Sequence, residues 1–279
     1  MVGVRQLPAV GDRQGDLLTP PGIDEPFEQP VRRVVRPVFG SVASIGIVGE
    51  VPGAGIEGCF ARLEEIEARF SPYRADSEIS RIRDGGLTIA DAHPEVREIL
   101  GACEALRDET EGVFDAWRAS VDGRLDPSGY VKGWAIGEAA AILRASGATN
   151  AAIGIGGDIA AWGGGAAGIG WSVGVVDPAK PDQMMARVAL RDAAIATSGL
   201  TERPEHLRDA RTGGVAVSPW ASFTVVGPSI ARADALATIG FLEGRPGLER
   251  VDREPGYGAL AAGRDGVLLA TEWFRRITI

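Results

Sequence analysis

The sequence predicts an α+β fold, in which helices pack on a mostly antiparallel sheet. Two observations carry this prediction. Amphipathic helical patterns dominate residues 56–147, and short apolar runs separated by glycine dominate the chain beyond them. A regular α/β fold would instead alternate strands and helices along the whole chain. The 279 residues are enough to bury a sizeable core.

The composition is that of a globular protein and excludes some functional classes. Hydrophobic residues make up 45% and charged residues 24%, an ordinary soluble mixture. The formal net charge of −9 argues against nucleic-acid binding, which depends on Lys and Arg neutralising phosphates. The sequence shows neither a run of about 18 apolar residues nor a secretory leader, so we expect no membrane span and a cytoplasmic location.

Residues 1–31 are predicted to form a flexible or extended N-terminal arm, and residues 32–279 a single domain. The arm contains five prolines among acidic and small residues, a composition that disfavours a packed core. Cys59 and Cys103 lie in apolar helical patterns, where a thiol usually behaves as a small buried hydrophobe. Two cysteines without metal-ligand spacing indicate neither a zinc site nor a disulfide framework.

The first elements of the domain follow from residue spacing. Residues 34–51 are rich in β-branched side chains interrupted by Pro and Gly, which predicts a strand pair. Apolar residues recur at helical spacing over 56–70 and 96–106, which predicts two amphipathic helices. A third helix is predicted from near Tyr130 to a stop at Gly147.

The second half of the chain is predicted to form strands with one helix among them. Its short apolar runs, bounded by glycine and other turn residues, are typical of strands. The predicted strands are Ala151–Ile155, Trp171–Val176, Arg187–Leu190, Phe223–Val226 and Val267–Thr271. The inserted helix is predicted over about Ala231–Leu242.

The segment from Asp126 to Trp134 reads as a tight turn that runs into a helix. The unpaired N–H groups of a helix start attract phosphate, and Lys132 in the first turn could add a positive charge. The alternative is a capped helix with an incidental lysine. A cation at a helix N-terminus opposes the macrodipole, which suggests that an anion offsets it.

The run Gly154–Asp158 resembles part of a dinucleotide fingerprint, but the residues after it do not open a helix. A Gly–Gly turn between two strands explains the glycines equally well. The functional interpretation is that glycine allows the backbone to approach a flat or phosphorylated ligand closely.

His206 begins a polar, turn-rich stretch that contains Asp209 and Arg211 and ends at Gly213. A loop histidine close in sequence to an aspartate and an arginine suits acid–base or phosphate chemistry. A solvated surface histidine is the simpler alternative. The other histidine, His93, precedes Pro94 and is interpreted as a helix-start residue.

Asp234 and Thr238 are four residues apart on the predicted inserted helix, so they share one face. A carboxylate and a hydroxyl offer two hard oxygen ligands of the kind that Mg²⁺ takes when phosphates complete its shell. The alternative is a buried aspartate bonded locally, with the threonine bonded to a helix carbonyl.

Together these segments resemble the ApbE family, the FAD:protein FMN transferases, in one order over most of residues 34–275. The resemblance is carried by Phe70–Tyr73, Ser77–Ser80, Gly112–Asp115, Asp126–Trp134, Gly156–Asp158, Ala196–Gly199, His206–Gly213 and Thr224–Pro228 leading to Asp234. The chain departs from the family pattern at Phe39, Arg83, Gly154 and Ala210, where Met, Asn, Asn and Pro are common.

The resemblance implies an ApbE-type, T-fold-like α+β unit that binds FAD in a cleft, with Mg²⁺ at the pyrophosphate. Its implied metal ligands are Gly129 and Ala237 through backbone oxygens, with Asp234 and Thr238. Its implied flavin or adenosine contacts are Phe39, Tyr73, Val113, Phe114, Asp115, Asp126, Lys132, Leu207 and Arg208. By the same resemblance, His206 is the candidate catalytic base.

The reaction that the resemblance implies moves FMN from FAD onto a Thr or Ser hydroxyl of an acceptor flavoprotein and releases AMP. Two alternatives remain open at this stage. The same site could use water and act as an FAD pyrophosphatase, releasing FMN and AMP. The chain could also bind and store FAD without catalysis.

Overall fold

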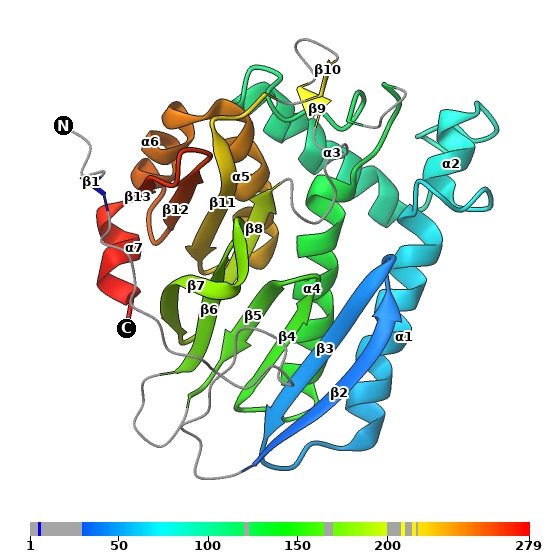
Figure 1. Cartoon of the computed structure of the whole chain (residues 1–279). Helices are drawn as coiled ribbons and strands as arrows, with labels where there is room; N and C mark the ends of the chain where they lie inside the picture. Colours follow the sequence, from blue (N-terminus) through cyan, green and yellow to red (C-terminus); the bar gives the residue numbers. More distant parts are fainter. Residues whose placement is uncertain are drawn as a thin grey trace.

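The computed structural model describes residues 5–6, 30–119, 123–164, 170–199, 208–209, 214–215 and 217–279. Its main feature is a nine-stranded sheet in the order β1-β13-β12-β11-β8-β5-β4-β3-β2, and every neighbouring pair is antiparallel (Figure 1). The predicted α+β class with a mostly antiparallel sheet is therefore confirmed.

The strands of this sheet are short; some neighbours are joined by tight turns, and others are far apart in sequence. In sheet order they are Arg5–Gln6, Leu268–Ala270, Gly258–Gly263, Trp220–Gly227, Ala193–Gly199, Asp158–Trp162, Ala151–Ile155, Ser41–Val48 and Val31–Val38. The predicted strand pair near the N-terminus is β2 and β3, joined by Phe39 and Gly40. Both turn residues have positive φ, 55° and 62°, as a two-residue hairpin turn demands.

Most of the helices pack on one face of the sheet, whereas a hairpin and the C-terminal helix pack on the other (Figure 1). The helices are α1 (Gly53–Phe70), α2 (Glu78–Arg83), α3 (Pro94–Glu109), α4 (Ser128–Ala145), α5 (Ile230–Glu243), α6 (Arg245–Arg253) and α7 (Glu272–Ile277). Helices α4 and α5 pack against each other and on the central strands, and α1 packs on α4. These two central helices therefore position any site that lies above the middle of the sheet.

The hairpin is formed by β6 (Trp171–Asp177) and β7 (Lys180–Leu190), which make a separate two-stranded sheet. Trp171 and Val188 are fully buried in the core that it shares with the large sheet. The indole nitrogen of Trp171 donates to the Trp162 carbonyl at 3.0 Å, which ties the hairpin to β5.

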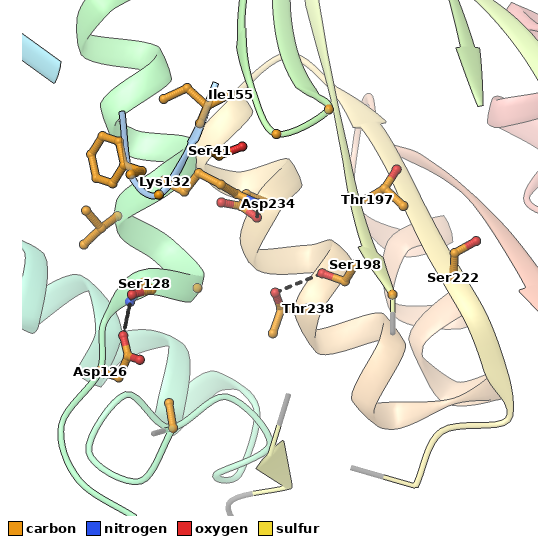
Figure 2. Close-up of a pocket in the computed structure, with 18 of the residues that line it drawn as sticks. Ser41, Asp126, Ser128, Lys132, Ile155, Thr197, Ser198, Ser222, Asp234 and Thr238 are labelled. Atoms are coloured by element: carbon orange, nitrogen blue, oxygen red, sulfur yellow. Dashed lines mark hydrogen bonds and ion pairs between the residues drawn. The ribbon is translucent and has the colours of Figure 1, made fainter. Parts of the chain in front are cut away.

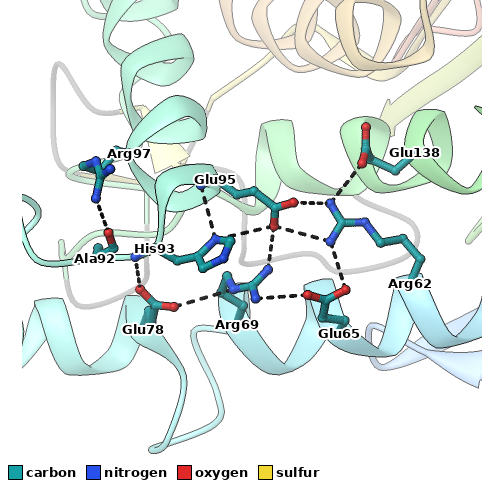
Figure 3. A network of polar contacts seen from close by, with 9 residues as sticks. All are labelled: Arg62, Glu65, Arg69, Glu78, Ala92, His93, Glu95, Arg97 and Glu138. Carbon is teal, nitrogen blue, oxygen red and sulfur yellow. Dashed lines mark hydrogen bonds and ion pairs between the residues drawn. The ribbon is translucent and has the colours of Figure 1, made fainter.

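Arginines of α1 bind four surrounding glutamates and so connect four helices (Figure 3). Arg62 reaches Glu95 of α3 at 2.5 Å and Glu138 of α4 at 2.9 Å. Arg69 reaches the same Glu95 at 2.5 Å and Glu78 of α2 at 3.6 Å. A half-buried network of this kind fixes the relative placement of helices better than isolated surface pairs do.

Several elements were not predicted from sequence. The strands β5 and β8 are rich in alanine, which has low strand propensity, and they form because both faces of the central sheet are buried. Gly244 ends α5 with a φ of 73° and α6 begins directly after it. Helix α4 begins at Ser128, earlier than the predicted start near Tyr130.

Cys59 and Cys103 are both buried, as the helical pattern predicted. Within the described residues, no helix is long and apolar enough to cross a membrane. Of the predicted N-terminal arm, only Arg5–Gln6 and residues 30–31 are described, and the first pair forms β1 against β13. The remainder of that prediction lies outside the described residues.

Candidate functional site

A cavity of about 1200 Å³ is lined by the central strands of the sheet and by helices α4 and α5. This volume exceeds the roughly 300–1,000 Å³ of a pocket for a drug-sized ligand, so the cavity can hold a larger molecule. Its walls come from the β2–β3 turn, residues 70–74, residues 113–116, the first turns of α4, the β6–β7 hairpin, β8 and α5. Segments distant in sequence therefore meet around one space (Figure 2).

A lysine between two buried carboxylates lies at the centre of the cavity wall. The Nζ atom of Lys132 on α4 is 2.6 Å from Oδ2 of Asp158, the first residue of β5. The same nitrogen is 3.6 Å from Oδ1 of Asp234 on α5. The carboxylate side chains are only 1% and 3% exposed. Lys132 was expected to have an anionic partner, and Asp158 supplies one within the chain.

Backbone N–H groups hold the second oxygen of each carboxylate. Gly133 N donates to Asp234 Oδ2 at 2.8 Å, and Thr197 N donates to Asp158 Oδ1 at 2.9 Å. Burial raises the pKa of the Asp234 carboxyl above its ordinary range, and the charge of Lys132 acts in the opposite direction. The charge of Lys132 therefore favours the ionised form of Asp234.

The close approach of α4 and α5 depends on Gly133. A Cβ atom there would lie 2.7 Å from the Asp234 Cβ and 2.8 Å from the Ile230 carbonyl oxygen. Both neighbours belong to α5, so neither could give way without moving that helix. Gly137 lies one turn later on α4 and has room for a side chain. A Cβ atom there would be 3.6 Å from its nearest neighbour, which is an ordinary van der Waals contact.

We expect Gly133→Ala to lower the free energy of unfolding by about 1–3 kcal/mol, the usual cost of overpacking a core. Gly137→Ala is the matched control on the same helix. It should be neutral or stabilising, because alanine is favoured over glycine in a helix interior. Denaturant unfolding of both variants measures the difference. Equal stability of the two variants would contradict the tight α4–α5 contact.

Thr238 lies one helical turn beyond Asp234 and also lines the cavity. Its hydroxyl is 3.2 Å from the Ser198 hydroxyl on β8, as Figure 2 shows. Gly129 at the start of α4 also lines the cavity, and a Cβ atom there would be 3.3 Å from the Phe114 ring. Ala237 is fully buried on α5 and is not part of the cavity lining.

These donors fit a magnesium ion that is bound together with phosphate. Mg²⁺ usually takes one or two carboxylates from the protein and completes its shell with water and substrate phosphates. In the described part of the chain, no group of three or more His, Cys, Asp or Glu side chains could hold a metal by itself. Asp234 offers a buried carboxylate, and its Oδ1 lies 3.6 Å from the Lys132 nitrogen.

The first turn of α4 opens onto the cavity through Ser128 and Gly129. Pro127 occupies the position before the helix and provides no side-chain cap. Asp126 accepts a hydrogen bond from Ser128 N at 2.9 Å (Figure 2). The remaining N–H groups of a helix start favour an anion, as predicted for this segment.

Comparison with known proteins identifies the family of this chain. The model of the ApbE family matches residues 39–123 and 116–261, which together span most of the chain. The chain belongs to the ApbE family. No curated protein sequence matches it.

Solved ApbE structures share the fold at low sequence identity. The flavin transferase ApbE from Vibrio cholerae is 22% identical, with a TM-score of 0.77 over 89% of this chain and 100% of its own. The Pseudomonas stutzeri flavinyl transferase ApbE is 21% identical, with a TM-score of 0.74 over 92% and 100%. The ApbE protein from Thermotoga maritima is 21% identical, with a TM-score of 0.77 over 90% and 100%.

Most residues expected from the ApbE resemblance surround the cavity. The described ones that line it are Phe39, Tyr73, Val113, Phe114, Asp115, Asp126, Gly129, Lys132, Asp234 and Thr238. Tyr73 is 78% exposed at the rim, whereas Phe114 is only 5% exposed. The Asp115 carboxylate makes contacts within its own region of the chain. Its Oδ1 accepts a hydrogen bond from Trp117 N at 2.9 Å, and its Oδ2 lies 3.5 Å from Arg107 Nε.

Three residues expected in the ApbE site are not placed by the structure. His206 and Leu207 lie outside the described residues. Arg208 belongs to β9 (Arg208–Asp209), which pairs with β10 (Gly214–Val215), but its side chain is likewise outside the description. The roles given to these residues remain predictions.

The site residues predicted from the sequence did not include three polar residues of the site. Asp158 was placed in a glycine-rich turn, which the structure confirms through positive φ at Gly156 and Gly157, but its pairing with Lys132 was not foreseen. Ser222 lines the cavity with a buried hydroxyl that has no hydrogen-bond partner among the described residues. Thr197 also lines it; its segment Ala196–Gly199 carried part of the family resemblance, but no site role was predicted for its hydroxyl.

Proposed function

We propose that this chain is a Mg²⁺-dependent FAD:protein FMN transferase. The observation that carries the proposal is the arrangement of Asp234 and Thr238 opposite the open first turn of α4, within a cavity of about 1200 Å³. Oxygen ligands for a divalent cation on one side and helix N–H groups on the other suit a pyrophosphate between them. Membership of the ApbE family supports the same assignment.

In this proposal, Asp234 and Thr238 hold the metal, with backbone oxygens of Gly129 and Ala237 as further candidates. When bound, Mg²⁺ neutralises charge on the pyrophosphate and on the leaving AMP. Lys132 and the first turn of α4 bind the phosphates and keep them in line with the attacking group. The aromatic rings of Phe39, Phe114 and Tyr73 provide apolar surface for the flavin or adenine ring.

His206 is proposed as the base that removes the proton from the attacking hydroxyl of the acceptor. The acceptor is a flavoprotein with a Thr or Ser flavinylation site. Transfer forms a phosphoester bond between that hydroxyl and the FMN phosphorus, breaks the pyrophosphate bond and releases AMP.

The test is to incubate the protein with FAD and Mg²⁺, with and without a flavoprotein that has a threonine flavinylation site. AMP release that requires the acceptor, together with an acceptor mass increased by FMN, is the expected result. AMP and FMN produced equally well without acceptor would indicate an FAD pyrophosphatase. Bound FAD with no AMP under either condition would indicate a storage protein.

Binding provides a second, independent test. We expect FAD to bind at least about tenfold more tightly than riboflavin, because charge-assisted hydrogen bonds to phosphate contribute roughly 1.5–3 kcal/mol each. Mg²⁺ should strengthen FAD binding and leave riboflavin binding unchanged. Isothermal titration of both ligands with and without Mg²⁺ measures this. Equal affinities for FAD and riboflavin would argue against a pyrophosphate site in the cavity.

A further inference from the structure

Lys132 does not lie midway between its two carboxylates. Its ammonium is in contact with Asp158 at 2.6 Å and stays 3.6 Å from Asp234. Both carboxylates are almost completely buried, so solvent screens neither attraction strongly. The unequal distances therefore reflect where the backbone places each acid.

Asp158 is held in place by its own strand. It follows the Gly156–Gly157 turn and begins β5, which lies between β4 and β8 inside the sheet. Its Oδ1 accepts from Thr197 N of β8, which leaves Oδ2 directed at the lysine. The carboxylate thus cannot follow Lys132 toward α5 without breaking the Thr197 hydrogen bond.

We infer that Asp158 is a positioning residue that keeps the Lys132 ammonium off Asp234 and so leaves Asp234 Oδ1 open to a divalent cation. The inference rests on the proposed function, because it assigns Asp234 to the metal. Without the Asp158 charge, Asp234 is the carboxylate of the described residues that remains within 4 Å of the ammonium, and the ammonium moves onto it. The lysine then competes with the cation for the same oxygen atom.

This relation predicts that a second substitution rescues the first. Asp158→Asn should weaken divalent cation binding by about ten- to a hundredfold, the scale of one charge-assisted contact at a partly desolvated site. Lys132→Met removes the competing cation and nearly keeps the side-chain volume. The double variant Lys132→Met/Asp158→Asn should therefore recover wild-type affinity, and Lys132→Met alone should match or exceed it.

The measurement is the affinity for Mn²⁺, followed by electron paramagnetic resonance of the free ion, on each purified protein without FAD. Omitting FAD removes any phosphate contact of Lys132 from the readout. Asp177→Asn is the matched control, since Asp177 lines the same cavity on the β6–β7 hairpin and its carboxylate accepts from Ala179 N instead. The control should bind Mn²⁺ as the wild type does.

Two outcomes overturn the inference. Unchanged Mn²⁺ affinity of Asp158→Asn would mean that Asp158 does not control the lysine. Loss of affinity that Lys132→Met fails to rescue would mean that Asp158 binds the ion itself or only maintains the fold. If Asp158→Asn does not fold, the double variant decides the question, because it removes both buried charges together. Wild-type affinity of the double variant supports the inference, and lost affinity contradicts it.

Failure of the inference can be separated from failure of the proposed function. Acceptor-dependent AMP release by the wild type tests the transferase activity without reference to Asp158. An active wild type whose Mn²⁺ affinity is insensitive to Asp158→Asn overturns the positioning role alone. A wild type that binds no Mn²⁺ overturns the positioning role and the metal dependence together.

Discussion

Replacing Asp234 by alanine is expected to reduce Mg²⁺-dependent AMP release by about a hundred- to a thousandfold. Metal stabilisation of developing charge is worth several kcal/mol, and each 1.36 kcal/mol is a factor of ten in rate. Asp234 provides the buried carboxylate on the cavity wall that lies opposite the α4 helix start. The measurement is initial AMP release from FAD over a range of Mg²⁺ concentrations.

Asp234→Asn distinguishes loss of the metal ligand from loss of packing. Asparagine keeps the side-chain shape and can still accept from Gly133 N, the partner at 2.8 Å in the wild type. Both variants should lose turnover to a similar degree, but the asparagine variant should unfold at nearly the wild-type temperature. Full AMP release by either variant at limiting Mg²⁺ would reduce Asp234 to a structural role.

Thr238 provides a graded comparison on the same helix. Thr238→Val keeps the side-chain shape and removes the hydroxyl. We therefore expect a smaller loss of AMP release, about five- to tenfold, which corresponds to the free energy of one neutral hydrogen bond. Thr238→Ser retains a hydroxyl and should preserve most of the activity. An equal loss in both variants would point to packing against Ser198 rather than to metal binding.

His206→Ala is expected to slow FMN transfer to a threonine-bearing acceptor by about 10²–10⁴-fold, the usual contribution of a general base. FAD affinity should change little, because the metal and helix-start contacts remain. The rate of the wild type should rise with pH as histidines lose their proton, near pH 6.5 in ordinary peptides, and the variant should lack this rise. Transfer kinetics under saturating FAD measure both effects.

The chain contains a natural control for this experiment. His93, the other histidine, caps α3 by accepting from Glu95 N at 3.3 Å (Figure 3). His93→Ala should cost about 1 kcal/mol of stability through the lost cap and should leave the transfer rate unchanged. Normal transfer by His206→Ala would move the base to another group, with Asp209 or Asp158 as the next candidates. Lost FAD binding would make His206 a binding residue instead.

Local sequence was sufficient for the elements whose pattern repeats over several turns. The helices α1 and α3 each bury one apolar stripe, so the 3.6-residue spacing of their apolar residues can be recognised in the sequence. The strand Ala151–Ile155 was predicted with its observed bounds, since glycines mark its end. The pair Asp234 and Thr238 was also visible, because four-residue spacing places two side chains together on any helix.

Other features exist only because distant segments meet. The alanine-rich strands β5 and β8 lack an intrinsic strand signal and are formed by burial at the centre of the sheet. From the sequence, an anion was expected beside Lys132 because a cation near a helix start is unfavourable. No local pattern identified Asp158, which lies on a strand of the sheet, as that anion. Spacing along the chain determines neighbours on one element, whereas contacts between elements depend on how helices and strands pack in three dimensions.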